Sequence, residues 1–310
     1  MAGHLITKHL EETKKYKVKN ICHKIIFNRN SIICDVLELD RFKNILQDIK
    51  PDIIINAIGI LNDKSDDNIV HTFYINTILP KWLENHYRNS SCKIIQLSTD
   101  CVFDGKKGLY KDIDDKTDES IYGLSKNFGE IVNDKDLTIR MSIIGPELTD
   151  GKGLFDWFMR QKDGVKGYAN VYWSGITTLE LAKIIDKAIN ENISGLYNVA
   201  PDNKISKYDL LQLIKKVFKK SNIEILKDES KHSDKSLIPT KKGFNCNVKS
   251  YEDMLIDLKT WMDDHLILYQ KYYSNTKEKK TAKIKTHEFT NKEDKDEILQ
   301  KSDLRVMKNE

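Results

Sequence analysis

The sequence predicts an α/β protein built on a doubly wound parallel sheet, which is a sheet covered by helices on both faces. Two observations carry this prediction. Short apolar runs alternate along the chain with segments of helical periodicity. In addition, residues 53–60 are almost wholly apolar and follow a turn, as expected of a strand buried on both faces. With 310 residues, the chain is long enough for one large domain or two smaller ones.

The first half is expected to alternate strictly between helices and strands, which favours parallel pairing. The strands are assigned from short apolar runs, the first helix from apolar residues near helical spacing, and the helix over 66–88 has mixed faces. In chain order these elements are a helix over 2–13, strands over 24–27 and 32–37, a helix over 40–49, a strand over 53–60, a helix over 66–88, a strand over 93–97, a helix over 119–133 and a strand over 137–142.

Capping patterns predict where three helices of the second half begin. In each pattern a hydroxyl residue is followed three positions later by an acidic residue. The pairs are Thr177 with Glu180, Ser206 with Asp209, and Ser250 with Asp253. A short strand over 196–199 lies between the first two helices, and the last helix is expected to end near residue 273.

Composition excludes several classes of protein. The net charge is only +4, and six of the 51 basic residues are arginine, so we expect no nucleic-acid partner. No apolar run approaches the roughly 18 residues of a membrane span, and we expect no signal peptide. The five cysteines are scattered and the eight histidines isolated, which predicts reduced thiols and no metal site. These features are typical of a cytoplasmic protein.

The composition changes near residue 274. Residues 274–310 hold ten basic and eight acidic residues with few apolar ones. This pattern predicts a charged, disordered extension, and a docking tail is the functional alternative.

Tyr122 and Lys126 carry the strongest chemical signal. Four residues apart on a helix, they share one face. An ammonium near the phenol would lower its pKa from about 10, so that the tyrosine could exchange a proton with an alkoxide or alcohol. Ser98 and Thr99 follow the predicted strand 93–97, at the sheet edge where ligands bind. Alone, the pair also fits a solvated helix face, and Ser98 could merely cap a turn.

These residues lie within motifs that resemble the extended short-chain dehydrogenase/reductase family, and within it the dTDP-4-dehydrorhamnose reductase branch. The resemblance extends from residue 1 to about 270. The matching motifs are STDCVFDG at 98–105, YGLSK at 122–126 with Gly129 and Glu130, NAIG at 56–59, and Asn76 with Pro80.

The resemblance implies a Rossmann-type sheet with a smaller α/β substrate domain, and an oxidoreductase that acts on a nucleotide sugar. NADPH would reduce the 4-keto group of a nucleotide-linked 6-deoxyhexulose, most simply dTDP-4-dehydrorhamnose, for surface polysaccharide synthesis. Tyr122 would protonate the oxyanion, Lys126 would lower the Tyr122 pKa and hold the nicotinamide ribose, and Thr99 would bind the reacting oxygen. A homodimer is compatible with this assignment.

The implied domains are not contiguous. Residues 1–150 would bind the cofactor, and residues 170–200 would return to that domain. Residues 151–170 and 201–273 would form the substrate-binding subdomain.

The resemblance is incomplete at the family's glycine-rich turn. Gly3 matches the last glycine of that turn, whereas the family's first strand and most of the turn have no counterpart in residues 1–310. We expect either a longer protein or a truncated chain that binds cofactor weakly.

Five further residues are candidates for cofactor binding. Arg29 follows the predicted strand 24–27 where an acidic residue would select NAD, so it favours NADP(H) over NAD(H) by pairing with the 2′-phosphate. A solvated loop arginine is the alternative. By family position, Asp35 would contact the adenine. Asn56 lies at a strand end, and Ala57 and Gly59 would leave room for the ribose and pyrophosphate.

The substrate side is less specified. The candidates are Ser98, Thr99, Arg140 as a phosphate ligand, and Trp157 and Trp173 as pocket walls; Arg140 could instead be structural and the tryptophans simple core. Two other functions stay open. One is reduction of a UDP-linked 2-acetamido-2,6-dideoxy-hexulose. The other is a non-catalytic regulatory subunit, because the regulatory β subunit of methionine adenosyltransferase is similar to the same branch.

Overall fold

The computed structural model describes residues 1–149, 151 and 153–273. They fall into two compact units, Met1–Lys259 and a part that starts at Thr260. The second unit contains the end of one helix and two short helices, namely α9 (Tyr251–Asp264), α10 (Leu266–Tyr269) and η4 (Gln270–Tyr272). The predicted charged extension, 274–310, lies outside the described residues.

A four-stranded parallel sheet forms the centre of the first unit. Its order is β3-β4-β5-β9, with bounds Ile53–Asn56, Lys93–Leu97, Leu137–Arg140 and Gly195–Asn198. Every residue of β4, β5 and β9 is buried, which explains why these strands read as continuous runs rather than alternating ones. The predicted parallel sheet of a Rossmann-type α/β fold is confirmed.

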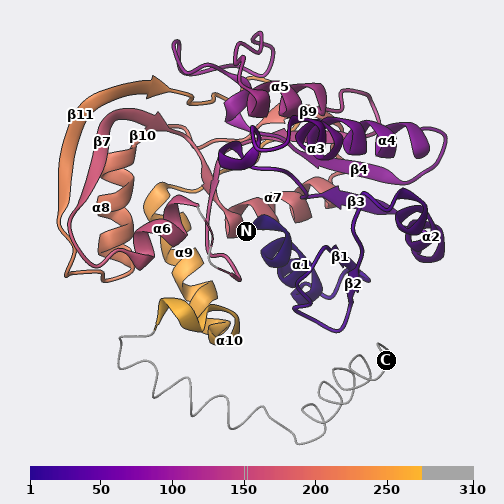
Figure 1. Cartoon of the computed structure of the whole chain (residues 1–310), viewed down its shortest axis with the longest axis horizontal. Coiled ribbons are helices and arrows are strands. Elements are labelled where there is room, and N and C mark those ends of the chain that lie inside the picture. The colour runs from indigo at the N-terminus through magenta and orange to yellow at the C-terminus, as the bar shows by residue number, and fades with distance from the viewer. Residues whose placement is uncertain (150, 152, 274–310) are drawn as a thin grey trace, which may run out of the picture. The chain divides into compact units, whose positions relative to one another are not determined.

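Helices cover both faces of this sheet. They are α1 (Ala2–Glu12), α2 (Leu39–Ile49), α3 (Ile69–Phe73), the π-helical turn η2 (Tyr74–Ile78), α4 (Leu79–His86), α5 (Ile121–Phe128) and α7 (Thr178–Asn190). Apolar residues of α2 and α4 pack with Ile94 of β4 in one core cluster. Helix α1 packs on α7, and in Figure 1 this pair lies on the other side of β4 from α3 and α4.

A separate parallel pair, β1 (Asn20–Cys22) with β2 (Ser31–Ile33), precedes the central sheet. The predicted strand over 24–27 is therefore wrong, and Ile25 and Ile26 are exposed. The Asn28 side chain explains the difference, because its oxygen accepts hydrogen bonds from Asn30 and Ser31 and fixes a turn just before β2. The residues that pair with β2 then lie before the apolar run, which becomes a loop.

A second sheet has the order β10-β7-β11, with α8 (Lys207–Val217) packed against it. Its strands are β7 (Val165–Trp173), β10 (Ile205–Ser206) and β11 (Ile225–Asp234). The remaining elements are α6 (Leu154–Arg160) and the short parallel pair β6 (Ile143–Ile144) and β8 (Ile176–Thr177). The sequence did not predict β7 or β11. The domain boundaries proposed from the sequence stay a prediction.

The capping patterns are confirmed at all three helices. The hydroxyl of Thr177 accepts from the Glu180 amide at 3.2 Å, and that of Ser206 accepts from the Asp209 amide at 3.0 Å. Ser250 accepts from the Asp253 amide at 3.2 Å. These bonds satisfy amides that the first helical turn leaves without a partner.

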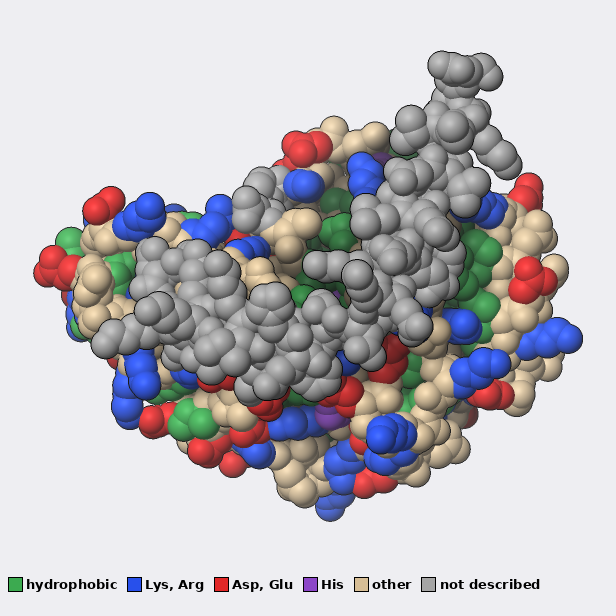
Figure 2. Space-filling view, turned by 90° about the horizontal axis from the view of Figure 1, so that it is seen from below, with side chains coloured by type: hydrophobic (Ala, Val, Ile, Leu, Met, Phe, Trp, Pro, Cys, Tyr) green, Lys and Arg blue, Asp and Glu red, His purple; other side chains and the backbone are tan. Residues whose placement is uncertain are grey.

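Within the described part of the chain, no helix has the length and apolar character to cross a bilayer, and no three metal-binding side chains gather. The five cysteines are free. On the described surface seen in Figure 2, Lys and Arg side chains are interspersed with Asp and Glu.

Candidate active site

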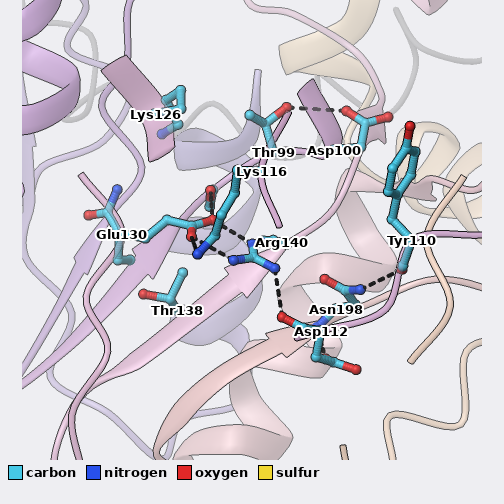
Figure 3. A network of polar contacts seen from close by, with 12 residues as sticks. Thr99, Asp100, Tyr110, Asp112, Lys116, Lys126, Glu130, Thr138, Arg140 and Asn198 are labelled. Atoms are coloured by element: carbon cyan, nitrogen blue, oxygen red, sulfur yellow. Dashed lines mark hydrogen bonds and ion pairs between the residues drawn. The ribbon is translucent and has the colours of Figure 1, made fainter. Parts of the chain in front are cut away.

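The site is built on the carboxyl end of β4. The Ser98 amide donates to the Ile139 carbonyl at 2.8 Å, and so continues the strand pairing one residue past Leu97. Thr99 then caps the 3-10 turn η3 (Asp100–Val102), with its Oγ1 accepting from the Cys101 amide at 3.1 Å. The same hydroxyl donates to Asp100 Oδ1 at 3.2 Å, as Figure 3 shows. Thr99 is therefore held rigidly at the sheet edge.

Helix α5 brings Tyr122 to Thr99. The helix begins at Ser120, whose Oγ accepts from the Gly123 amide at 3.1 Å. A Cβ at Gly123 would collide with Asp118 and with the Cys101 carbonyl, so only glycine lets α5 come this close to η3. The structure brings Tyr122 close to Thr99, whose side chain is among the groups that act on the pKa of the phenol.

The pKa of Tyr122 is raised above 10, contrary to the predicted lowering. Burial of the phenol is the largest cause, and the nearby Cys101 and Asp100 add to it, while the Thr99 hydrogen bond opposes part of the rise. Lys126 is not among the groups that shift this pKa. The tyrosine is consequently a neutral phenol at pH 7 that carries its proton.

Lys126 faces the end of β4 and the loop after β3. Its Nζ donates to the Leu97 carbonyl at 2.7 Å, and a Cβ built on Gly59 would lie 3.9 Å from the same nitrogen. Burial lowers the Lys126 pKa to about 8, and Glu130 opposes this shift. The structure thus brings together Lys126 and Gly59, two of the predicted cofactor residues.

Asn76 holds this arrangement in place. Its side-chain amide donates to the Ile60 carbonyl at 3.0 Å and to Ser125 Oγ at 3.1 Å, and its Oδ1 accepts from the Ile60 amide at 2.9 Å. The residue is buried and lies in the π-helical turn η2. It therefore connects the loop after β3 to the helix that carries Tyr122 and Lys126.

Two more cofactor candidates meet at the start of α1. A Cβ on Gly3 would lie 3.8 Å from Ala57 Cβ, which is ordinary contact. Asn56 is buried, donates to Gln96 Oε1 at 2.8 Å and accepts from the Ile58 amide at 3.3 Å. Asn56 therefore shapes the loop that presents Ala57.

Arg29 does not directly follow a strand, contrary to the prediction, whereas Asp35 lies close to the residue that follows β1. Strand β1 ends at Cys22, so Arg29 does not directly follow a strand, and it is exposed near the end of the connecting loop. Asp35 Oδ2 lies 3.4 Å from Nε2 of His23, the residue after β1. Contact of Arg29 with a 2′-phosphate and of Asp35 with adenine stays a prediction.

The structure contradicts the predicted substrate roles of Arg140 and Ser98. The Arg140 guanidinium is 1% exposed and forms a two-pronged ion pair with Glu130 at 2.6 and 2.7 Å, while Nη1 donates to the Asp112 carbonyl at 3.0 Å (Figure 3). Ser98 Oγ donates to the same Glu130 carboxylate at 2.8 Å. A guanidinium held in this way is committed to Glu130 and Asp112 and cannot reach a phosphate, and the Ser98 hydroxyl supports the same ion pair.

Lys207 is a further candidate site residue, which the sequence did not reveal. It is the first residue of α8, and its Nζ lies 5.2 Å from the centre of the Trp173 ring. Burial lowers its pKa, and Asp100 and Cys101 oppose the shift, which places the ammonium beside the residues that follow Thr99. Its Nζ has no hydrogen-bonding acceptor or ion pair among the described residues. A lysine at a helix start opposes the helix dipole, and this is the one signal that the sequence offered.

The two tryptophans differ. Trp173 is buried and donates from Nε1 to Ser142 Oγ at 2.8 Å, so it forms a fixed wall beside Lys207. Trp157 lies on α6, and its ring contacts Phe158. A role for Trp157 in substrate binding stays a prediction.

Comparison with known proteins identifies the family to which this fold belongs. The family model described as RmlD substrate binding domain matches residues 9–264. A hypothetical dTDP-4-dehydrorhamnose reductase from Sulfolobus tokodaii is 25% identical with a TM-score of 0.65, over 75% of this chain and 88% of that chain. The dTDP-4-dehydrorhamnose reductase from Bacillus anthracis, solved in complex with NADP, is 20% identical with a TM-score of 0.71, over 84% and 95%.

The WbmG enzyme of Bordetella bronchiseptica, solved with NAD and UDP, is 13% identical with a TM-score of 0.68, over 86% of this chain and 92% of that chain. No curated protein matches the sequence. The family model spans most of the chain and includes Thr99, Tyr122 and Lys126. The chain therefore belongs to the RmlD substrate binding domain family of extended short-chain dehydrogenases/reductases.

Proposed function

We propose that the protein is an NADPH-dependent reductase of the 4-keto group of a nucleotide-linked 6-deoxyhexulose, with dTDP-4-dehydrorhamnose as its substrate. One observation carries the proposal. The hydroxyls of Thr99 and Tyr122 meet at the carboxyl end of β4, with the Lys126 ammonium at the same strand end. The similar reductases named above support the substrate class.

The residues around Lys126 fit a nicotinamide cofactor, which supplies the hydride when bound. The Lys126 ammonium beside Gly59 can hold ribose hydroxyls, since no side chain at Gly59 blocks the approach. The first turn of α1 contains no acidic residue, so its amides favour a phosphate near Gly3. His23 and Lys24, rather than an acid, follow β1, and this favours a 2′-phosphate and thus NADPH.

Tyr122 and Thr99 act on the reacting oxygen. Tyr122 is neutral at pH 7, so it can donate its proton to the carbonyl oxygen as negative charge develops there. Thr99 Oγ1 donates a second hydrogen bond once its hydrogen turns from Asp100 to the substrate. The unpaired ammonium of Lys207, above Trp173, can contact a sugar or phosphate oxygen.

Replacement of Tyr122 by phenylalanine tests the proposal. With dTDP-4-dehydrorhamnose and NADPH, we expect kcat to fall by about 10²-fold or more, because the proton donor is lost. Tyr87→Phe, a tyrosine beyond the end of α4, is the matched control and should leave kcat unchanged. Full activity of Y122F would refute the catalytic assignment. Turnover of only a UDP-linked 2-acetamido-2,6-dideoxy-hexulose would reject the dTDP-sugar, and tight NADPH binding without turnover of either sugar would indicate a regulatory subunit.

A further inference from the structure

Asp100 is a buried carboxyl group of the candidate site to which the proposed function assigns no chemical step. It is the first residue of η3 and is 7% exposed. Its Oδ1 lies 3.2 Å from Thr99 Oγ1, as Figure 3 shows, and 3.5 Å from the Cys101 sulfur. Within the described part of the chain these are the only hydrogen bonds of the Asp100 side chain, and it forms no ion pair there.

These surroundings favour the protonated form of the Asp100 carboxyl group. A buried carboxylate needs an ion pair or several strong donors to replace the water it loses, and one hydroxyl and one thiol provide little of this. Burial accordingly raises the pKa of Asp100, while Lys207, Lys235 and the two hydrogen bonds oppose part of the rise. Lys235 is itself paired with Asp118 at 2.7 Å. Asp100 can therefore keep its proton at a pH where an ordinary aspartate is ionised.

Tyr122 must regain a proton after each turnover. In the proposed reaction the phenol gives its proton to the substrate oxygen, and the phenolate that remains is a strong base, because burial raises the Tyr122 pKa above 10. Lys126 is not among the groups that act on this pKa, and its Nζ donates to the Leu97 carbonyl. Thr99 is such a group, and its hydroxyl contacts Asp100. The route from the phenol thus leads through Thr99 to Asp100.

We propose that Asp100 returns the proton to Tyr122 through the hydroxyl of Thr99. The inference rests on the proposed function, because it completes the same reaction cycle. The Thr99 O–H bond breaks as its proton passes to the phenolate, and the Asp100 O–H bond breaks as its proton passes to the Thr99 oxygen. Asp100 is left as a carboxylate and takes its next proton from water. Each cycle therefore consumes one hydride from NADPH and one proton from water.

The contact between Thr99 and Asp100 serves this transfer without movement of either oxygen. When the Thr99 hydrogen turns toward the phenolate, a lone pair of the same oxygen can accept from the protonated carboxyl group of Asp100. The Cys101 amide donates to Thr99 Oγ1 at 3.1 Å and keeps this oxygen in place. The ammonium groups of Lys207 and Lys235 then stabilise the carboxylate that the transfer leaves behind.

The protonation of Asp100 can be measured without catalysis. In the wild-type chain, isotopically labelled at the aspartate carboxyl carbon, NMR should show an aspartic acid that is still protonated at about pH 6, where an ordinary aspartate is ionised. Its signal should disappear in Asp100→Asn and remain in Asp40→Asn, which replaces an exposed carboxylate. Absence of any protonated aspartate at this pH overturns the proposal. Protonated signals that are unchanged in D100N overturn it as well.

Stopped-flow measurement of NADPH oxidation, with dTDP-4-dehydrorhamnose and NADPH both saturating, separates proton return from reduction. We expect D100N to complete its first turnover at nearly the wild-type rate and then to slow by at least about 10-fold, because Tyr122 waits for a proton. Y122F, by contrast, should lose the first turnover. Wild-type kcat should fall as the pH rises through the Asp100 pKa, and D100N should lack this dependence.

The outcomes separate this proposal from the proposed function. Equal slowing of the first and later turnovers in D100N would indicate a structural role and overturn proton return. If D100N does not fold, a wild-type kcat that does not fall up to about pH 9 overturns it instead. A wild-type protein with the protonated aspartate but no turnover of the sugar would refute the proposed function, whereas turnover without a protonated aspartate would refute this proposal alone.

Discussion

The ammonium of Lys126 donates a hydrogen bond to the carbonyl oxygen of Leu97 at 2.7 Å. Leu97 is the last residue of β4, so this bond ties α5, which carries Tyr122 and Lys126, to the strand that precedes Thr99. Because burial lowers the Lys126 pKa to about 8, the charge on this group changes within an accessible pH range.

Cofactor affinity should therefore depend on the protonation of Lys126. Below about pH 8 the ammonium can bind ribose hydroxyls, and above it the neutral amine binds them more weakly. We expect the KM for NADPH to rise between about pH 7 and about pH 9. In Lys126→Met this KM should be high throughout and lose its pH dependence. A wild-type KM that stays constant over this range would contradict the role of Lys126.

Removal of Arg140 should destabilise the fold rather than weaken substrate binding. Arg140→Met removes the two-pronged partner of the buried Glu130 carboxylate and leaves only Lys116 at 3.9 Å, and breaking a buried pair typically costs about 3–5 kcal/mol of unfolding free energy. Urea unfolding measures this loss, and the double variant with Glu130→Gln should recover part of it. If R140M were as stable as wild type but had a raised substrate KM, Arg140 would be a substrate ligand after all.

His4 should make the fold sensitive to mild acid. Burial lowers the His4 pKa from 6.5 to about 3, so the unfolded chain binds a proton below about pH 6.5 that the folded chain does not. Its contribution is fully present above that pH and is lost as the pH falls, by about 2 kcal/mol at about pH 5. His4→Phe should flatten this slope in urea unfolding at several pH values. An unchanged slope would show that other groups cause the acid sensitivity.

Gly129 should not tolerate a side chain. A Cβ there would collide with the Asn76 carbonyl, and Gly129→Ala should therefore lower the unfolding free energy by about 1–3 kcal/mol. Gly3→Ala is the matched control, since its Cβ would make only ordinary contact within α1 and should stabilise the helix by about 0.5–1 kcal/mol. Thermal unfolding compares them, and equal stability of G129A and wild type would contradict the collision.

Lys207 should affect binding of the substrate and not binding of the cofactor. Lys207→Met removes the charge beside Trp173 and Asp100, so we expect the sugar-nucleotide KM to rise by about 10-fold with the KM for NADPH unchanged. Lys204→Met, whose ammonium pairs with Asp234, is the control. Equal kinetics in K207M and wild type would exclude a substrate contact.

The central sheet and the placement of Tyr122 and Lys126 on one helix could be predicted because their signals are local. Strand β4 is a short apolar run, and Tyr122 and Lys126 lie four residues apart on one helix. The exposed loop at 24–27 could not be predicted from its apolar run, because the Asn28 turn decides which residues pair with β2. A local sequence pattern therefore predicts an element correctly where its apolar residues are also buried in the fold.

Arg140 and Lys207 could not be interpreted from the sequence, because their partners come from other elements of the fold. The partner of Arg140 is Glu130, which lies outside its strand, and only the fold reveals that the pair is buried. Lys207, Trp173 and Asp100 belong to three different elements, α8, β7 and η3, so no spacing in the sequence indicates that they lie close together. Strand β11 escaped prediction because much of it is exposed and polar.

The π-helical turn η2 also has a consequence for insertions and deletions during evolution. An α-helix rotates about 100° per residue, and a π-turn holds one extra residue per turn. The turn thus lets Asn76 face the site while Leu79 and Leu83 of α4 stay on the buried side. Deletion of one residue from this stretch would turn either Asn76 away from the site or Leu79 and Leu83 away from the core. Sequence length in this helical stretch is therefore constrained even where residue identity is free.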